Sequence, residues 1–179
     1  MIRISQDIET EPVSIDDVKQ FIKFSDDDSD EISLITDMLK GVRVHIEKMT
    51  GLSFAKKTIQ EKFDKNNSGI YVLHVAPVIS IDSVYSLDIE EEQTKLTLNE
   101  DYYASGMYER ILKVYGVDTQ LKVEYSVGYG EEETEDLPFD LKQAVLRQVI
   151  QWYDNRDEYL QATYMDTIGS IIRQYQRKW

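Results

Sequence analysis

The hydrophobic period of this chain changes twice, and the changes divide it into helical and strand-forming parts. Before Ser53, apolar residues recur at spacings of three and four, which is the period of an amphipathic helix. From Ser53 to Gly128 they fall in short, partly alternating runs, which are typical of antiparallel strands. After Leu137 the helical spacing returns. We therefore expect an α+β fold, mainly a helical scaffold with an antiparallel β region inserted at about residues 53–128.

Two helices are predicted before the β region. Ser14 and Asp17 have the spacing of a capping box, with Ser14 as the N-cap, and they start a short helix. A longer helix is predicted over about residues 30–49, and Gly51 is its expected stop because glycine accepts the left-handed conformation after a helix. Residues 1–12 show no clear periodicity, so we expect a flexible arm there.

The β region is expected to form an antiparallel sheet or a small barrel. Short strands are predicted over residues 58–63, 70–75, 81–87, 95–98, 102–105, 111–115 and 121–127. Turn signals separate them, and no helical crossover lies between them, which argues against βαβ units. Gly128-Tyr129-Gly130 ends the region and is interpreted as a turn that uses the freedom of glycine at positive φ.

Two further helices are predicted after this turn. One spans about residues 138–159, with Pro138 at its first helical position. Asp166 can cap a last, short helix. We accordingly predict three parts, which are the arm at 1–12, a main domain at 13–160 and a C-terminal segment at 161–179.

Charge and composition exclude several classes of function. The formal net charge is −14, which argues against a protein that tracks DNA phosphates and against adsorption on anionic membranes. The chain has no cysteine, so disulfides and thiolate metal sites are excluded. No apolar run approaches the ~18 residues that a membrane span needs, and the first residues lack the apolar stretch of a signal peptide.

Residues that could support catalysis or metal binding do not form a recognisable pattern. His45 and His74 have no histidine or cysteine at metal-ligand spacing, so a surface or core-edge role is the expectation for both. The acidic run 26–30 fails the calcium-loop pattern, since position six is Glu31 instead of glycine. These carboxylates suit a helix N-terminus. We therefore predict no cofactor, no metal and no enzymatic activity.

The last helix combines an apolar stripe with a basic end. Its apolar residues recur at positions i, i+3, i+4 and i+7, and they are Ile168, Ile171, Ile172 and Tyr175. A basic group follows in Arg173, Arg177 and Lys178, and the chain ends in Trp179. A helix this short is only marginally stable alone in water, so its apolar stripe has to pack against another protein surface. That surface is either the helix's own domain or a partner subunit.

Four segments, in this order, carry a family resemblance. They are Ile46-Glu47-Lys48-Met49-Thr50-Gly51, the run 75–84 (VAPVISIDSV), Glu124-Tyr125-Ser126-Val127-Gly128-Tyr129-Gly130 and Leu137-Pro138-Phe139-Asp140-Leu141-Lys142-Gln143-Ala144. Together they resemble the head–tail connector, or head-completion adaptor, proteins of tailed bacteriophages. The likeness covers about residues 14–175, whereas the acidic N-terminal arm and the loop 131–136 depart from it.

The resemblance implies a structural virion protein. Such proteins form an oligomeric ring beneath the portal of the capsid, extend the DNA channel without sequence-specific binding, and offer a platform for the stopper or tail. The residues that would then dock on the portal are Asp166, Ile168, Ile171, Ile172, Arg173, Tyr175, Arg177, Lys178 and Trp179. An acidic loop would either line the channel or an interface or be a solvated outer loop, and its residues are Glu131, Glu132, Glu133, Glu135 and Asp136.

The resemblance also implies a location at the head–tail interface of the virion, and in the bacterial host cytoplasm during assembly. Two alternatives stay open beside it. The chain could be another phage neck or tail-completion protein, or a host-directed interaction module. The second alternative is an enzyme, which would need a deep pocket with a strongly perturbed titratable group.

Overall fold

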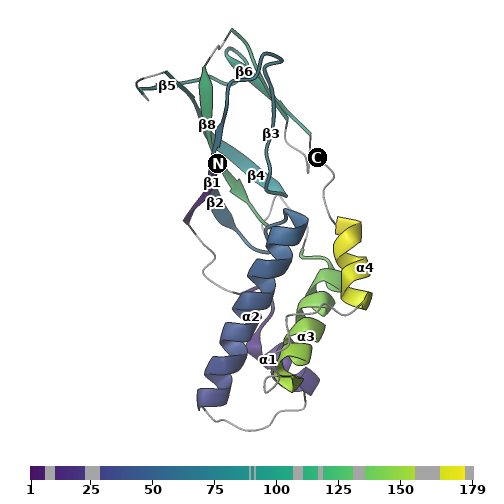
Figure 1. Cartoon of the computed structure of the whole chain (residues 1–179). Helices are drawn as coiled ribbons and strands as arrows, with labels where there is room; N and C mark the ends of the chain where they lie inside the picture. Colours follow the sequence, from purple (N-terminus) through teal and green to yellow (C-terminus); the bar gives the residue numbers. More distant parts are fainter. Residues whose placement is uncertain are drawn as a thin grey trace. The chain divides into compact units, whose positions relative to one another are not determined.

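The structure is a computed structural model, and it describes residues 1–6, 11–22, 29–88, 90, 92–106, 111–116, 119–130, 136–155 and 166–175. The described residues contain four helices and eight strands, and Figure 1 labels all of these except β7. They belong to two compact units. Residues 1–9 and 55–136 form the first, here called the β unit, and residues 10–54 and 137–179 form the second, the helical unit.

The β unit contains two antiparallel sheets. Its strands are β1 (Ile2–Gln6), β2 (Lys57–Phe63), β3 (Ile70–Val72), β4 (Val78–Leu87), β5 (Gln93–Lys95), β6 (Tyr102–Ser105), β7 (Ile111–Val114) and β8 (Gln120–Val127). The larger sheet has the order β1-β2-β8-β4-β5, and the smaller has the order β3-β7-β6. Every pairing between neighbouring strands is antiparallel, as the turn-separated short runs predicted.

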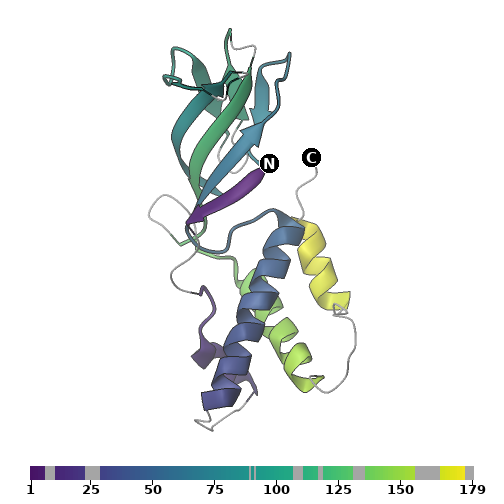
Figure 2. The ribbon, with the colours of Figure 1, turned by 60° about the vertical axis from the view of Figure 1, so that its left-hand side comes forward.

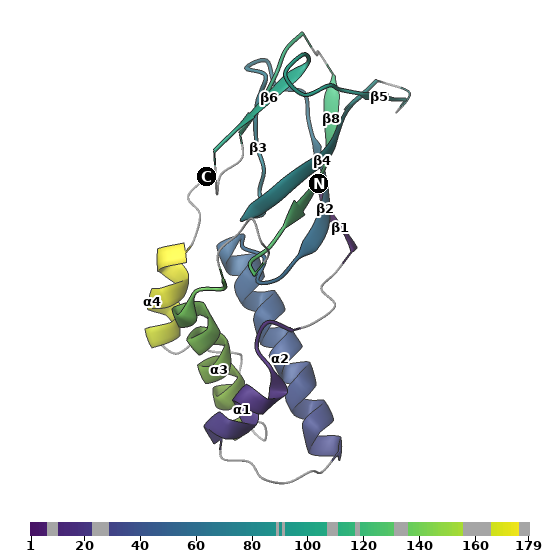
Figure 3. The ribbon, with the colours of Figure 1, turned by 180° about the vertical axis from the view of Figure 1, so that it is seen from behind.

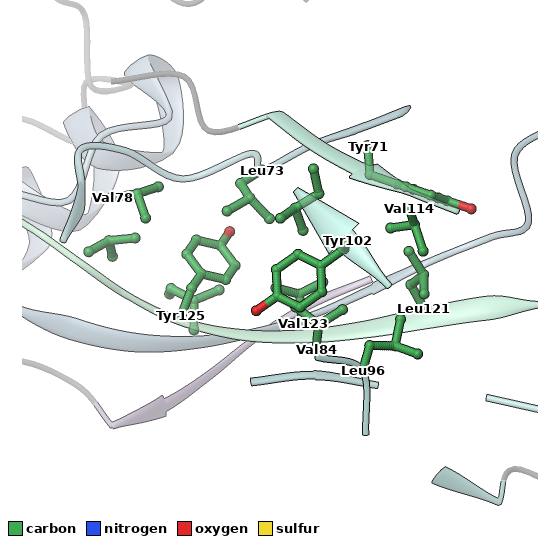
Figure 4. Packing of buried hydrophobic residues seen from close by; sticks show 13 residues of the cluster. Tyr71, Leu73, Val78, Val84, Leu96, Tyr102, Val114, Leu121, Val123 and Tyr125 are labelled. Atoms are coloured by element: carbon green, nitrogen blue, oxygen red, sulfur yellow. The ribbon is translucent and has the colours of Figure 1, made fainter. Parts of the chain in front are cut away.

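The core of the β unit takes side chains from both sheets. Strand β8 buries alternate residues, because successive side chains of a strand point to opposite faces. Its inward residues Leu121, Val123 and Tyr125 are fully buried, and Figure 4 shows them among residues of the other strands. The wider cluster contains Ile59, Tyr71, Leu73, Val78, Val84, Leu96, Tyr102, Leu112, Val114 and Val127. This unit therefore has an apolar core of its own.

Gly128 ends β8 at a position that only glycine fits. Its φ is +135°, and a Cβ built on it would lie 2.4 Å from the carbonyl carbon and oxygen of Ala55. No real Cβ contact is that short, so a side chain here would push two backbone segments apart. The glycine turn predicted after the last strand is confirmed, and the reason is close backbone approach as well as φ.

The helical unit contains α1 (Ile15–Ile22), α2 (Ser29–Thr50), α3 (Phe139–Asp154) and α4 (Asp166–Tyr175). Helix α3 packs on α2 and α1, and α4 packs on α3 and α2 (Figure 3). The buried stripe of α2 includes Ile35, Leu39, Val42 and Ile46, at spacings of three and four. Leu141, Ala144, Val145 and Val149 form the matching stripe of α3. Apolar stripes thus hold this unit together.

The predicted helix signals at α1 and α2 are confirmed in detail. The backbone amide of Asp17 donates to Ser14 Oγ at 3.0 Å, and the amide of Ser14 donates to Asp17 Oδ2 at 3.1 Å. This reciprocal pair is a capping box. Gly51 has a φ of +73°, and its amide donates to the carbonyl of Glu47 at 2.9 Å, which ends α2.

Helix α3 differs from its prediction at both ends. Pro138 is the N-cap, with φ −51° and ψ +135°, and is not the first helical residue. The extended ψ places its carbonyl to accept from the amide of Lys142 at 3.1 Å. The helix ends at Asp154, before the predicted end at 159, and residues 156–165 lie outside the described part.

The prediction of a mainly helical scaffold with a β insertion is wrong. The chain is β-rich, with eight described strands in two antiparallel sheets and a separate core for them. The reason lies partly in the N-terminus, where a flexible arm was expected at residues 1–12. Residues Ile2–Gln6 instead form β1, which pairs with β2 and lies in the β unit (Figure 2).

Candidate functional site

Helix α4 is the described part of the segment predicted to dock on a partner. Ile168 and Ile172, one turn apart, are 0% and 1% exposed, and α4 packs on α2 and α3 of the same unit. Half of the predicted apolar stripe therefore lies on the chain's own domain, which is the first of the two surfaces considered for it.

A side-chain hydrogen bond connects the end of α4 to α3. The hydroxyl of Tyr175 donates to the carboxylate of Asp140, with its oxygen 2.9 Å from Oδ1 and 3.0 Å from Oδ2. Asp140 lies in the first turn of α3, and its Oδ1 also accepts from the amide of Leu141 at 3.0 Å. A carboxylate at a helix N-terminus is favoured by the helix dipole. The contact therefore joins the last described residue of α4 to the start of α3.

Only part of the surface of α4 is exposed and could contact a partner. Ser170, Arg173 and Gln174 are exposed, and Ile171 and Tyr175 are partly exposed. The side chain of Asp166 is not described, and Arg177, Lys178 and Trp179 lie outside the described residues. Docking through this segment stays a prediction, and it now involves Arg173 and the residues beyond Tyr175 more than the buried isoleucines.

The acidic loop gives less information. Residues 131–135, which include the four glutamates named for the channel or interface role, lie outside the described part. Asp136 is exposed. The role of this loop also stays a prediction.

A buried charge network in the helical unit was not found by sequence reasoning. Arg43 on α2 is 4% exposed, and its Nε donates to Glu11 Oε2 at 2.7 Å and its Nη1 to Glu47 Oε2 at 2.8 Å. The other oxygen of Glu47 accepts from the amide of Phe54 at 2.8 Å. The network therefore holds the segment before α1 and the segment after α2 against α2. Its signal in the sequence is the i, i+4 spacing of Arg43 and Glu47 next to the apolar stripe.

A second polar cluster lies inside the β unit. Glu61 on β2 is 1% exposed, and its carboxylate accepts from the hydroxyl of Tyr125 at 2.8 Å and from the amide of His74 at 3.2 Å. The ring nitrogen Nδ1 of His74 also contacts this carboxylate. Two donors and the contact with the His74 ring satisfy the buried carboxylate, so the cluster is a structural tie between β2, β8 and the segment after β3.

The outer face of the larger sheet carries a hydrogen-bonded carboxylate. Gln60 Nε2 donates to Glu124 Oε1 at 2.8 Å, and Ser83 Oγ donates to Glu124 Oε2 at 2.9 Å. These hydrogen bonds, with a smaller contribution from the Lys122 ammonium, lower the pKa of Glu124 below its ordinary value. Burial raises the pKa of Tyr102 in the core of the same unit.

No cluster of three or more His, Asp or Glu side chains that could hold a metal ion occurs among the described residues. His45 is exposed on α2, and His74 takes part in the cluster at Glu61. No described helix has the length and apolar character to cross a membrane.

Comparisons with known proteins give a consistent result. A family model described as "Head completion protein" matches residues 11–169. Among solved structures, a chain from the neck of an empty gene transfer agent particle, computed with C6 symmetry, superposes with a TM-score of 0.79 at 14% identity, covering 100% of this chain and 96% of that one. No curated protein sequence matches.

Two further structures show the same fold. A chain from the virion of the native gene transfer agent particle has a TM-score of 0.78 at 15% identity, and one from the neck of the native particle, computed with C12 symmetry, has 0.76 at 16%. Each match covers 100% of this chain and 96% of the other. At such identities these likenesses establish the fold alone.

Proposed function

The chain belongs to the head completion protein family, and from this premise we propose that it is a structural neck protein of a tailed phage or phage-like particle. The observation that carries the proposal is the family match over residues 11–169, which includes most of both units. The location that follows is the virion, after assembly in the cytoplasm of the bacterial host. The proposed role is mechanical and needs no reaction.

The finer proposal is an oligomeric ring that joins the capsid portal to the stopper or tail. The similar chains come from necks whose structures were computed with sixfold and twelvefold symmetry, which supports a ring. The net charge of −14 suits a channel that DNA must pass, because an acidic lining repels phosphates and leaves the duplex mobile. A ring repeats one heterologous contact, so each subunit needs two different complementary surfaces.

Portal contact is proposed for the exposed side of α4 and the residues that follow it. Arg173 is exposed on α4, and Arg177, Lys178 and Trp179 continue the basic end in the sequence. The buried Ile168 and Ile172 would hold α4 in place as a support for this basic end. A charge reversal at the exposed Arg173 should therefore change portal binding without changing the stability of the fold.

The test measures binding to the cognate portal. Arg173→Glu should weaken portal binding while the unfolding midpoint in urea stays within error of the parent chain. Arg147→Glu is the matched control, since Arg147 is an exposed arginine on α3 of the same unit. Equal portal binding by both variants and the parent would refute docking through α4.

The second candidate is a different neck or tail-completion protein or a host-directed interaction module. Its favouring observation is that half of the apolar stripe of α4 is already buried on the chain itself. A chain that stays monomeric at high concentration, and also in the presence of portal, would favour this candidate.

A further inference from the structure

Strands β1 and β5 form the two edges of the larger sheet, and they differ in chemistry. β1 (Ile2–Gln6) pairs only with β2 on its inner side, and β5 (Gln93–Lys95) pairs only with β4, as far as the described residues go. The outer backbone amides and carbonyls of an edge strand can accept another strand. Within the part of the chain that the structure describes, no further strand pairs with either edge.

The β1 edge is protected only in part, by the charge of Arg3 and by a register shift between Ile4 and Gln6. Ile2 and Ile4 lie opposite Glu61 and Ile59, whose side chains are buried, so the two isoleucines point to the core side of the sheet. They nevertheless remain 46% and 50% exposed. β1 contains no proline, and Arg3 is its one charged residue. An edge of this kind is a predicted site of strand addition.

The β5 edge is polar and is preceded by carboxylates. Its three residues Gln93, Thr94 and Lys95 are all exposed. The side chain of Asp88 accepts from the amides of Glu90 and Glu92, at 2.8 and 2.9 Å, which fixes the turn before the strand. Glu90 and Glu92 are exposed, so two solvent-accessible acidic residues lie just before β5 in the sequence.

The directions of the edge strands set how they could meet. Because every neighbouring pair in the order β1-β2-β8-β4-β5 is antiparallel, β1, β8 and β5 run in the same direction. A second copy added to the sheet in the same orientation would therefore place its β1 parallel to β5 of the first. Arg3, near the start of β1, would then lie beside Glu90 and Glu92, near the start of β5.

We propose that β1 of one copy pairs in parallel with β5 of the next, so that the larger sheet continues from subunit to subunit. This inference rests on the proposed ring, because a head-to-tail contact between two different edges is what a ring repeats. The pairing covers Ile2 and Ile4, supplies a strand to the outward-facing backbone groups of both edges, and brings opposite charges together. The partner that pairs with each edge is thus a second copy of this chain.

Cysteine cross-linking tests the contact directly, because the natural chain has no cysteine. The variant Ile4→Cys/Thr94→Cys carries one thiol on each edge. Within one chain the two edges are separated by three strands, which is about 19 Å at ordinary strand spacing, too far for a disulfide. Mild oxidation, with and without portal, should therefore give a ladder of dimers, trimers and longer species.

The single variants and a misplaced pair serve as controls. Ile4→Cys alone and Thr94→Cys alone should stay monomeric on a non-reducing gel. The double variant Ile111→Cys/Thr94→Cys should give no ladder of cross-linked species. Its first thiol replaces Ile111, an exposed residue of β7 in the other sheet. Dimers from Ile4→Cys alone would mean that β1 pairs with β1 of a second copy, and this result overturns the proposal.

A charge swap tests the register independently. Arg3→Glu should weaken subunit association by about two- to fivefold per contact, in the range of exposed ion pairs. The triple variant Arg3→Glu/Glu90→Lys/Glu92→Lys should restore it. Lys40→Glu, which makes the same charge change at an exposed position of α2 in the other unit, should have no effect. Failure of the triple variant to regain association would contradict the register.

The outcomes separate this inference from the proposed function. Rings seen by electron microscopy without a cross-linked ladder would refute the edge pairing and leave the neck ring standing. A ladder in a chain that does not bind portal would support the pairing and refute portal joining. Absence of both rings and ladder, with portal present, would refute both.

Discussion

The hydroxyl of Tyr175 lies 2.9 and 3.0 Å from the two carboxylate oxygens of Asp140, and this contact fixes the end of α4 to the first turn of α3. Together with the buried Ile168 and Ile172, it makes α4 part of the helical unit. The basic residues that follow α4 in the sequence therefore start from a fixed support.

Removal of that hydroxyl should loosen α4. Tyr175→Phe leaves the carboxylate of Asp140 without this donor and should lower the free energy of unfolding by about 1–2 kcal/mol, the range for a hydrogen bond to a charged group that is partly exposed. Urea denaturation measures the change. Tyr103→Phe, at a side chain that is 51% exposed, is the control and should be neutral. An equal effect of both substitutions would argue against the contact.

Truncation of Arg43 should destabilise the helical unit strongly. Arg43→Ala removes the buried guanidinium that contacts Glu47, and the expected loss is about 3–5 kcal/mol in the free energy of unfolding. Lys40→Ala, at an exposed position of the same helix, should change it by less than about 0.5 kcal/mol. A loss below 1 kcal/mol at Arg43 would show that the network is not a structural tie.

The two glycines after β8 should respond differently to alanine. Gly128→Ala places a Cβ 2.4 Å from the Ala55 carbonyl, so it should cost well over 2 kcal/mol through clash and strain. Gly130→Ala meets nothing within 4 Å and should cost about 1–2 kcal/mol, the penalty of a left-handed conformation. Thermal unfolding of the two variants measures both losses of stability. Equal losses would contradict the close approach of Gly128 to Ala55.

Stability should depend on the ionisation of Glu124. Its pKa is lowered in the folded protein by the hydrogen bonds from Gln60 and Ser83, so its contribution is present above the unfolded carboxyl pKa and is lost as the pH falls through the folded value. Glu124→Gln should therefore be less stable than the parent at pH 7, and the difference should shrink toward pH 3. A difference that is constant with pH would contradict this linkage.

The sequence predicts those elements whose signals are local. The capping box at Ser14 and Asp17 and the glycine stop at Gly51 depend only on neighbouring residues, and both are observed. The alternation from Leu121 to Val127 likewise follows from burial on one face. Periodicity therefore located most helices and strands to within a few residues.

Tertiary contacts explain what was missed. The period of β1 was not recognised, because its isoleucines are half exposed at an edge and the strand exists only through pairing with β2. Burial of Arg43 and Glu61 also depends on partners distant in sequence, such as Glu11 and Tyr125, which no local pattern supplies. Local patterns also left the packing of α4 undecided, because periodicity predicted an apolar stripe but not the surface that covers it.

Electron microscopy of the chain mixed with its cognate portal tests the proposed neck function most directly. We expect closed rings of this chain seated coaxially on the portal, with an open central channel. A chain that remains monomeric and leaves the portal unoccupied, at concentrations where the portal itself is intact, would contradict the function proposed here.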